Sequence, residues 1–309
     1  MKKVFIDGKA GTTGLRIEER LSARDDIEII TIPEELRKDP LTKKQILNSV
    51  DVAFLCLPDA ASIESVSLIE NPDVVVIDTS TAHRTNPAWA YGFPELDKSF
   101  EEKIKNSKRI AVPGCHASGF IALVYPLIKN GIISKDTLLT ATSLTGYSGG
   151  GKKMIADYES DELDMLLQGP RQYGLAQKHK HLPEMLNVTG LINEPVFCPI
   201  VGTFYSGMEV TVPLFKSQLL KGRIDDIRKI YKDLYNTSLV SYVEGEDEEG
   251  FLSAVKLEGK DSMQIEVYGN EDRILLVARY DNLGKGASGA AVECLNIVLG
   301  EDKTKTLEI

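Results

Sequence analysis

This chain of 309 residues lacks a hydrophobic run long enough to cross a membrane, since its longest uninterrupted apolar stretches have only the length of a strand. Residues 1–7 enter a strand pattern directly, without the apolar core and small-residue cleavage site of an exported protein, so we expect no signal peptide. We therefore expect a cytoplasmic protein without a membrane partner.

Cysteine is scarce, and negative charge outweighs positive charge. The four cysteines are widely spaced and include no C-x-x-C pair, which argues against a disulfide framework or a zinc ribbon and fits a reducing compartment. The formal net charge of −10 argues against general affinity for nucleic acid, so an anionic ligand needs a local cluster of basic or N–H groups. We expect neither a metal site nor a nucleic-acid partner.

What the sequence does contain, at its start, is an alternation of strand and helix patterns. Short apolar runs rich in β-branched residues alternate with runs of helical periodicity. The strand patterns cover residues 3–7, 27–32, 52–57 and 74–78, and the helical patterns cover residues 15–24, 43–50 and 60–69. This order predicts an α/β domain with a Rossmann-like, doubly wound parallel sheet.

From residue 138 onward the pattern changes to longer runs of alternating polar and apolar residues, which predict a second, α+β domain with a mixed or largely antiparallel sheet. Residues 286–299 are rich in small residues at helical spacing, which indicates a closely packed helix that returns to the first domain. We therefore expect a dinucleotide-binding domain of residues 1–114 and 285–309, and a catalytic and dimerisation domain of residues 115–284.

A glycine-rich loop follows the first strand pattern, where Gly8, Gly11, Thr12, Thr13 and Gly14 precede a helix. Glycines let the backbone approach a phosphate, and the N–H groups that open a helix offer donors and a positive dipole. The spacing departs from G-x-G-x-x-G, which leaves a merely tight turn as the alternative. The position between a strand and a helix favours dinucleotide binding.

The second strand pattern ends without an acid at its tip, where NAD-binding proteins place a ribose-binding carboxylate. Arg37 and Lys38 lie nearby and can receive a 2′-phosphate, which favours NADP(H), although a solvated basic loop is the alternative. Pro58 and Ser80 follow the third and fourth strand patterns. Because the carboxyl ends of parallel strands face the ligand, we expect both residues at the cofactor.

Cys115 stands between an apolar run at residues 109–112 and a helix-like run at residues 120–129. Unpaired N–H groups and the positive end of a helix dipole favour thiolate over thiol at such a junction. Cys56, Cys198 and Cys294 lie inside apolar runs and fit small buried hydrophobes. Cys115 is flanked instead by Pro, Gly and Ser, so we expect it to be the nucleophile.

Polar clusters in the second domain are candidates for substrate binding and proton transfer. Ser148, Gly149 and Lys152 form a loop that can hold a carboxylate or phosphate, unless the loop is a flexible linker. His179 and His181 are two of only four histidines, and imidazole titrates near neutral pH, which favours acid–base chemistry over metal binding. Arg171 is either a substrate anchor or a surface charge.

Several motifs, in order along essentially the whole chain, resemble the short form of the N-acetyl-γ-glutamyl-phosphate reductase family. They are residues 11–14, 113–115, 148–152, 179–184 and 282–289. The wider superfamily includes aspartate-semialdehyde dehydrogenase and, more distantly, glyceraldehyde-3-phosphate dehydrogenase. The His-x-His-x-Pro-Glu segment favours the acetylglutamyl-phosphate branch. His116 departs from the pattern, since many relatives carry an aromatic residue directly after the nucleophile.

The resemblance implies NADPH-dependent reduction of N-acetyl-L-glutamyl 5-phosphate to N-acetyl-L-glutamate 5-semialdehyde, with release of phosphate, in arginine biosynthesis. It implies that Cys115 forms a thioester and that His181 manages the proton of the hemithioacetal, with His179 as the alternative acid–base. It also implies that Asn282 lies at the cofactor. The residues implied at the substrate are Ser148, Gly149, Lys152, Arg171, His179 and Glu184.

Three alternatives stay open from the sequence. Two are enzymes that share the cysteine chemistry: an aspartate-semialdehyde dehydrogenase, and a reductase of an acyl phosphate carried on a protein. A nucleotide-binding redox sensor is the non-catalytic alternative. In the favoured interpretation the partner is a small-molecule acyl phosphate, and a homodimer or homotetramer forms through the sheet of the second domain.

Overall fold

The computed structural model describes residues 1–36 and 39–309, and the chain divides into two compact units. The first unit consists of Met1–Pro94, Lys98–Pro113 and Ala287–Leu307. The second unit consists of Glu95–Asp97, Gly114–Gly286 and Glu308–Ile309. No helix among the described residues is both long and apolar enough to span a bilayer.

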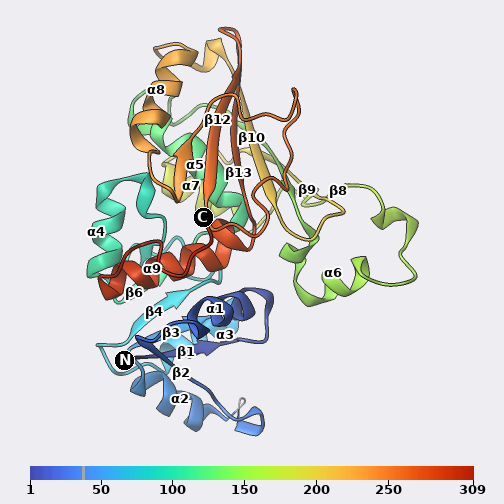
Figure 1. The fold of residues 1–309 in the computed structure, drawn as a ribbon. Helices are drawn as coiled ribbons and strands as arrows, with labels where there is room; N and C mark the ends of the chain where they lie inside the picture. The colour runs from blue at the N-terminus through green and yellow to red at the C-terminus, as the bar shows by residue number, and fades with distance from the viewer. Residues whose placement is uncertain (37–38) are drawn as a thin grey trace. The chain divides into compact units, whose positions relative to one another are not determined.

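The first unit is built on a parallel sheet of six strands in the order β2-β1-β3-β4-β6-β5 (Figure 1). Its strands are β1 (Lys2–Asp7), β2 (Ile27–Ile30), β3 (Val52–Leu55), β4 (Val75–Asp78), β5 (Ala90–Tyr91) and β6 (Arg109–Ala111). Its helices are α1 (Thr12–Ser22), α2 (Pro40–Ser49), α3 (Asp59–Ser67), α4 (Lys98–Asn106) and α9 (Gly289–Leu299). This arrangement confirms the predicted doubly wound sheet.

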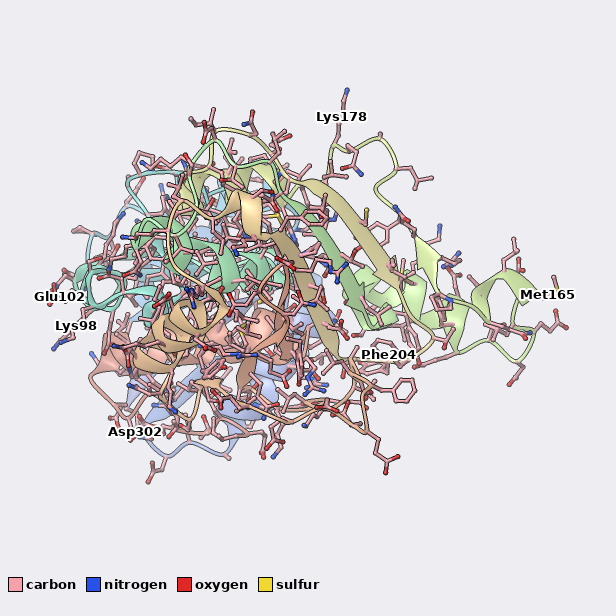
Figure 2. The ribbon with its side chains drawn as sticks, turned by 90° about the horizontal axis from the view of Figure 1, so that it is seen from above. Lys98, Glu102, Met165, Lys178, Phe204 and Asp302 are labelled. Atoms are coloured by element: carbon pink, nitrogen blue, oxygen red, sulfur yellow. The ribbon has the colours of Figure 1, made fainter. Side chains whose placement is uncertain are left out.

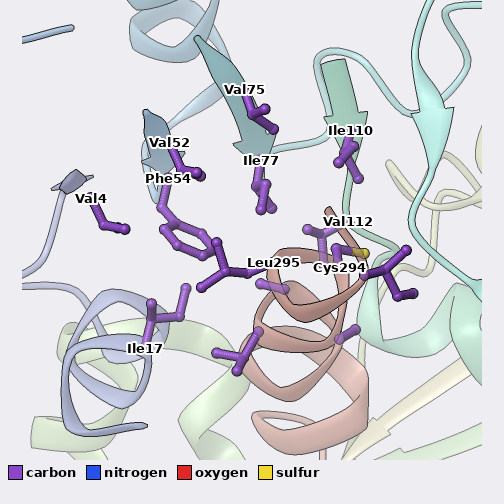
Figure 3. Packing of buried hydrophobic residues seen from close by; sticks show 14 of the residues in the cluster. Val4, Ile17, Val52, Phe54, Val75, Ile77, Ile110, Val112, Cys294 and Leu295 are labelled. Carbon is purple, nitrogen blue, oxygen red and sulfur yellow. The ribbon is translucent and has the colours of Figure 1, made fainter. Parts of the chain in front are cut away.

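Two clusters of buried side chains cover the two faces of this sheet. Val52 and Phe54 of β3 pack in one cluster with residues of α1 and α9, whereas Ala53 and Leu55 pack in the other with residues of α2. Figure 3 shows Phe54 directed toward Leu295 of α9. Because neighbouring side chains of a strand point to opposite faces, β3 is apolar throughout, as a strand covered on both faces must be.

The second unit is built on a mixed sheet of seven strands in the order β11-β12-β13-β10-β7-β9-β8. Its strands are β7 (Thr140–Thr145), β8 (Arg171–Gln172), β9 (Val196–Val201), β10 (Met208–Phe215), β11 (Val240–Tyr242), β12 (Met263–Gly269) and β13 (Arg273–Tyr280). The pairs β7–β9 and β11–β12 are parallel and the others antiparallel. Figure 2 shows Met165 at the outer end of the segment that joins β7 to β8.

Four helices belong to the second unit: α5 (Cys115–Lys129), α6 (Gly151–Tyr158), α7 (Leu182–Thr189) and α8 (Ile224–Leu234). The apolar helix α5 packs on one face of the sheet against β10 and β13, with α7 and α8 beside it (Figure 1). Along β10 the residues Val210, Val212 and Leu214 are buried, while Pro213 and Phe215 on the other face are exposed. The sheet therefore has one covered face and one open face.

Helix α5 contains Pro126, which has no N–H to donate to the carbonyl of Ala122 four residues earlier. Tyr235, which follows α8, supplies the missing donor, since its hydroxyl donates to the Ala122 oxygen at 2.7 Å. The hydroxyl of Tyr231 donates to the neighbouring Leu123 oxygen at 2.5 Å. Two buried tyrosines thus satisfy backbone groups of the helix that begins at Cys115.

Candidate active site

Cys115 is the first residue of α5, and Gly114 is the N-cap before it. Gly114 has no side chain with which to cap the helix, so N–H groups of the first turn and the positive end of the dipole lie at this cysteine. The Cys115 side chain is partly exposed, whereas residues 116–124 are buried. An accessible thiol at a helix N-terminus suits a nucleophile, and the N–H groups suit stabilisation of an oxyanion.

Tyr280, the last residue of β13, fixes the first turn of α5. Its hydroxyl donates to the Cys115 carbonyl at 2.6 Å and accepts the N–H of Gly119 at 3.0 Å. In a regular helix these two backbone groups would bond to each other directly, and here the hydroxyl bridges them. A Cβ at position 119 would lie 2.7 Å from this hydroxyl, which requires glycine there. Burial, with the nearby Cys115, raises the pKa of Tyr280 well above its ordinary value, so the hydroxyl keeps its proton.

Glu184 anchors the residue on the other side of the nucleophile. Its carboxylate is buried in the first turn of α7 and accepts the N–H of Gly114 at 2.8 Å. This bond ties the turn ahead of Cys115 to the segment that carries His179 and His181. The sequence predicted Glu184 at the substrate; the structure shows its contact with the backbone beside the nucleophile, and the substrate contact stays a prediction.

His179 and His181 lie against His116, the residue that follows the nucleophile. Their ring centroids are 5.5 and 5.6 Å from that of His116 and 4.7 Å from each other. Burial, with nearby Lys180, lowers the pKa of His179 to about 4, so this ring is neutral at pH 7. His181 is the N-cap of α7 and only 4% exposed. Both imidazoles therefore pack on the residue that follows the nucleophile, and their acid–base role stays a prediction.

His116 is itself held between two hydroxyl groups. Its Nδ1 lies 2.6 Å from Ser143 Oγ and its Nε2 lies 2.6 Å from Tyr173 Oη. Burial, with His179 and Lys180 nearby, lowers the pKa of His116 to about 3, so the ring is neutral. The described residues include no cluster of three His, Cys, Asp or Glu side chains placed to hold a metal ion.

Sequence reasoning missed the hydroxyls of Ser143, Tyr173 and Tyr280. They come from β7, from the turn after β8 and from the end of β13, so only tertiary packing brings them to α5. The one local signal is the position of Tyr173, six residues ahead of His179 in the predicted acid–base segment.

The residues predicted to anchor the substrate lie in two environments. Ser148 is buried, and its oxygen accepts from the Asn282 amide at 3.0 Å, while the Asn282 oxygen accepts the N–H of Gly207 at 2.9 Å. Gly149 and Lys152 are exposed. Asn282, predicted at the cofactor, thus has a defined contact with the Ser148 loop, and its cofactor contact stays a prediction.

Arg171 begins β8 and is partly buried. Its guanidinium nitrogens donate to the Tyr158 hydroxyl at 3.0 and 3.2 Å, and its guanidinium carbon lies 5.3 Å from the centre of that ring. The ring of Tyr158 stacks in turn on Tyr147 at 4.7 Å. Arg171 therefore joins a packed aromatic group, and its role as a substrate anchor stays a prediction.

The glycine-rich loop of the first unit connects β1 to α1. Gly8 has φ +84°, and a Cβ there would lie 2.2 Å from the Cys56 carbonyl oxygen; a Cβ on Gly14 would lie 2.6 Å from the Gly8 oxygen. Gly11 is the N-cap of α1, with Thr12 as the first helical residue. The start of α1 therefore has glycines whose backbone no side chain covers, and this arrangement fits a pyrophosphate.

The ends of the neighbouring strands carry the other predicted cofactor residues. Pro58 is the N-cap of α3. Ser80 is buried, and both its N–H and its hydroxyl donate to the Asp78 carboxylate, at 2.9 and 2.7 Å. The same carboxylate lies 2.6 Å from Nδ1 of His83, whose ring stacks on Trp89. The loop after β4 is therefore held in one conformation by Asp78.

A pocket lies at the carboxyl ends of β1 and β2, lined by Gly8, Lys9, Thr31, Ile32 and Lys43 among others. The Lys43 ammonium lies 2.7 Å from the Asp7 carboxylate, and the Lys9 ammonium lies 3.2 Å from Glu18. Arg37 and Lys38, predicted to receive a 2′-phosphate, lie outside the described residues.

Two domain families match this chain. One is described as "Semialdehyde dehydrogenase, NAD binding domain" and matches residues 12–107; the other is "Semialdehyde dehydrogenase, dimerisation domain" and matches residues 115–282. Curated relatives named N-acetyl-gamma-glutamyl-phosphate reductase are also similar. That of Sinorhizobium medicae is 45% identical over 96% of this chain and 98% of its own length, and that of Brucella ovis is 45% identical over 97% and 99%.

Solved structures show the same fold at low sequence identity. Aspartate semialdehyde dehydrogenase II of Vibrio cholerae, complexed with ASA, has a TM-score of 0.73 at 16% identity, covering 97% of this chain and 98% of that one. The Candida albicans enzyme with NADP has a TM-score of 0.70 at 16% identity, again covering 97% and 98%. At such identity the likeness establishes the two-domain fold alone.

Proposed function

Because the chain belongs to the N-acetyl-gamma-glutamyl-phosphate reductase family of semialdehyde dehydrogenases, we propose that it reduces N-acetyl-L-glutamyl 5-phosphate to N-acetyl-L-glutamate 5-semialdehyde and releases phosphate. The reaction is a step of arginine biosynthesis, which we place in the cytoplasm. The observation that carries the proposal is the position of Cys115 at the open N-terminus of α5, with His179 and His181 against the same turn.

The chemistry begins at the Cys115 sulfur. The thiolate attacks the acyl carbon, the C–O bond to phosphate breaks, and the products are a thioester on Cys115 and inorganic phosphate. Reduction of this thioester gives a hemithioacetal, whose C–S bond then breaks to release the aldehyde and return the thiolate. N–H groups of the first turn of α5 face the oxyanion of each tetrahedral stage.

His181 is assigned as the acid–base that takes up the hemithioacetal proton, and His179 as its alternative. Both rings lie near the first turn of α5 through their packing on His116. The lowered pKa of His179 makes it a weaker base than an ordinary imidazole.

The first unit carries the features that a dinucleotide requires. Gly8, Gly11, Thr12, Thr13 and Gly14 would hold the pyrophosphate through backbone N–H groups, since the glycines leave that backbone bare. When bound, NADPH supplies the hydride that reduces the thioester.

The preference for NADP(H) rests on the residues around the end of β2. Thr31 and Ile32 stand where an NAD-specific acid is expected, and Lys9 and Lys43 line the same pocket. The remaining cofactor contacts that we propose are Arg37, Lys38, Pro58, Ser80 and Asn282. The proposed substrate contacts are Ser148, Gly149, Lys152, Arg171, His179 and Glu184.

We also propose that the chain forms a homodimer or homotetramer through the open face of the mixed sheet. Leu275 on β13 is 41% exposed and pairs directly with the exposed Pro213 on β10. Phe215 on the same face is 62% exposed. Apolar side chains gathered on one sheet face suit a second copy of the chain, and the matching family is described as a dimerisation domain.

The test is phosphate-dependent reduction of NADP⁺ with N-acetylglutamate 5-semialdehyde and aspartate semialdehyde side by side. We expect turnover with the acetylated aldehyde, loss of that turnover in Cys115→Ser, and NADPH binding by that variant, measured by fluorescence. Turnover with aspartate semialdehyde alone, or retained turnover in Cys115→Ser, would contradict the proposal.

A further inference from the structure

The outer edge of β9 continues beyond the end of β8. Val201 of β9 pairs with Arg171 of β8, and the Pro199 oxygen accepts the N–H of Tyr173 at 3.0 Å. Phe197 lies two residues before Pro199, so its backbone N–H and oxygen face the same edge, because alternate residues of a strand share their orientation. These groups need partners, and β8 has already ended there.

The side chain of Gln177 supplies both partners. Its amide nitrogen donates to the Phe197 oxygen at 2.7 Å, and its amide oxygen accepts the Phe197 N–H at 2.9 Å. Gln177 lies in residues 173–181, which we call the histidine loop and which form neither a helix nor a strand. Figure 2 shows the next residue, Lys178, pointing away from this part of the chain. One side chain thus takes the place of a paired strand residue.

The backbone of the histidine loop has an uncommon conformation at this point. Gly174 has φ +65° and Gln177 has φ +53°, and the Gln177 N–H donates to the Gly174 oxygen at 2.9 Å. A residue with a side chain rarely adopts a positive φ, and it keeps one only where other contacts hold it. The amide pair with Phe197 is such a contact.

The same residue of β9 contacts His179. The ring centroids of His179 and Phe197 are 5.2 Å apart, with the rings edge to face, and Phe197 is buried. Nδ1 of His179 accepts the backbone N–H of His181 at 3.2 Å. Because a backbone N–H can only donate, the neutral His179 ring carries its proton on Nε2. The loop thus fixes both the place and the tautomer of this imidazole.

We propose that Gln177 is a positioning residue, which pairs with the backbone of Phe197, holds the histidine loop on β9 and thereby keeps the His179 ring against Phe197 and His116. The proposal rests on the proposed function for the use made of His179, which is there a substrate contact and the alternative acid–base. The position of the ring is a property of the free protein, so it can be measured without substrate.

The titration of His179 reports where its ring lies. Burial first, and then Lys180, lower the pKa of His179 from 6.5 to about 4. The titratable groups around the ring are Lys180 of the same loop, Tyr173 at its start, His116 of α5 and His181 before α7. If the loop leaves β9, the ring becomes exposed and its pKa rises toward 6.5.

The experiment follows nitrogen-15-labelled histidine rings by NMR as the pH is lowered from 8 to 4.5. The chain has only four histidines, and His179→Asn assigns the signal. We expect the wild-type His179 ring to carry its proton on Nε2 at pH 7 and to stay mostly neutral at pH 5. In Gln177→Met its pKa should rise by about one pH unit or more.

The variants separate the amide from other properties of the residue. Gln177→Met keeps the length and the charge of the side chain but removes its donor and its acceptor. Gln177→Gly also removes the amide, while glycine adopts a positive φ freely, so a rise in both variants assigns the effect to the lost amide. Leu175→Ala is the control, because it truncates a side chain of the same loop that is 74% exposed, and it should leave the titration unchanged.

Turnover of the aldehyde with phosphate is measured on the same proteins. We expect kcat to fall by about 10-fold or more in Gln177→Met, since a misplaced ring costs alignment, and to stay at the wild-type value in Leu175→Ala.

Each outcome decides one part of the proposal. An unchanged His179 titration in both Gln177 variants would overturn it, and so would an equal rise in Leu175→Ala. A rise with unchanged kcat would overturn the role of Gln177 in the reaction. Because the titration needs no substrate, a wild-type protein without reductase activity would contradict the proposed function and still leave the placement of His179 decided.

Discussion

At the scale of single residues, the site separates groups that react from groups that hold them. Cys115 and His181 are assigned to the reaction, whereas Tyr280 and Glu184 bind the backbone on either side of the nucleophile. Tyr280 and Glu184 thus act on the backbone that carries the nucleophile, through the Cys115 carbonyl and the N–H of Gly114 respectively.

The two histidines should differ when each is replaced by asparagine. We expect His181→Asn to lower kcat by about 10²–10⁴-fold, the range that general acid–base catalysis contributes. His179→Asn should cost less, since the pKa of His179 is lowered to about 4 and the ring is a poor base. Steady-state kinetics of the aldehyde oxidation would check this order. A larger loss of kcat in His179→Asn than in His181→Asn would make His179 the principal acid–base.

His116 should also make stability depend on pH. Its pKa is about 3 in the folded chain, against an ordinary value of 6.5, so between these values the unfolded chain binds a proton that the folded chain does not. The free energy of unfolding therefore falls as pH drops below 6.5. From pH 7 to pH 5 this histidine accounts for about 2 kcal/mol of the fall.

The measurement is urea unfolding of the wild type and His116→Gln at pH 7 and pH 5. Glutamine does not titrate, so the variant should lose less stability on acidification than the wild type does. Other groups, His179 among them, titrate in both proteins and cancel in the comparison. An equal loss in the two proteins would show that His116 is not buried as a neutral ring.

At the scale of elements, α5 connects the nucleophile to the core of the second unit. Its proline leaves the Ala122 carbonyl without its helical donor, and the Tyr235 hydroxyl fills that place at 2.7 Å. The helix that begins at Cys115 thus depends on a side chain located more than a hundred residues later in the sequence.

A double-mutant cycle tests this dependence. Tyr235→Phe should reduce the free energy of unfolding by about 1–3 kcal/mol, because it leaves a buried carbonyl without a partner. In a Pro126→Ala background the new N–H of residue 126 can donate to Ala122, so the same change should cost less. Equal costs in both backgrounds, measured by denaturant unfolding, would contradict the compensation.

At the scale of the whole molecule, the open face of the mixed sheet is the surface that we expect a second copy to cover. Leu275→Arg places a charge among the exposed apolar side chains of this face. We expect light scattering after size-exclusion chromatography to give a dimer or tetramer for the wild type and a smaller species for the variant. An unchanged mass for Leu275→Arg would locate the interface elsewhere.

Much of the fold was predictable because its signals are local. The alternation of strands and helices over residues 3–78 predicted the parallel sheet, and the loop from Gly8 to Gly14 lies between β1 and α1 as expected. Cys115 was predicted at a helix start and is the first residue of α5. Each of these inferences depends only on residues that are near one another in the sequence.

The hydrogen-bonding partners of the site were not predictable, because they are set by tertiary packing. Nothing near Ser143 or Tyr280 in the sequence indicates that their hydroxyls meet α5, and the contact of His116 with Tyr173 spans 57 residues. The predicted basic pair Arg37 and Lys38 lies outside the described residues, so the cofactor preference rests on the pocket beside Lys9 and Lys43.

The central claim is a covalent thioester on Cys115, and the most direct test is to trap it. The protein is mixed with NADP⁺ and N-acetylglutamate 5-semialdehyde without phosphate, quenched in acid and measured by mass spectrometry. We predict one N-acetylglutamyl group on the Cys115 peptide, one NADPH formed per site, and loss of the adduct when phosphate is added. If no adduct forms on Cys115 in the absence of phosphate, and the protein nevertheless turns over once phosphate is added, the claim is contradicted.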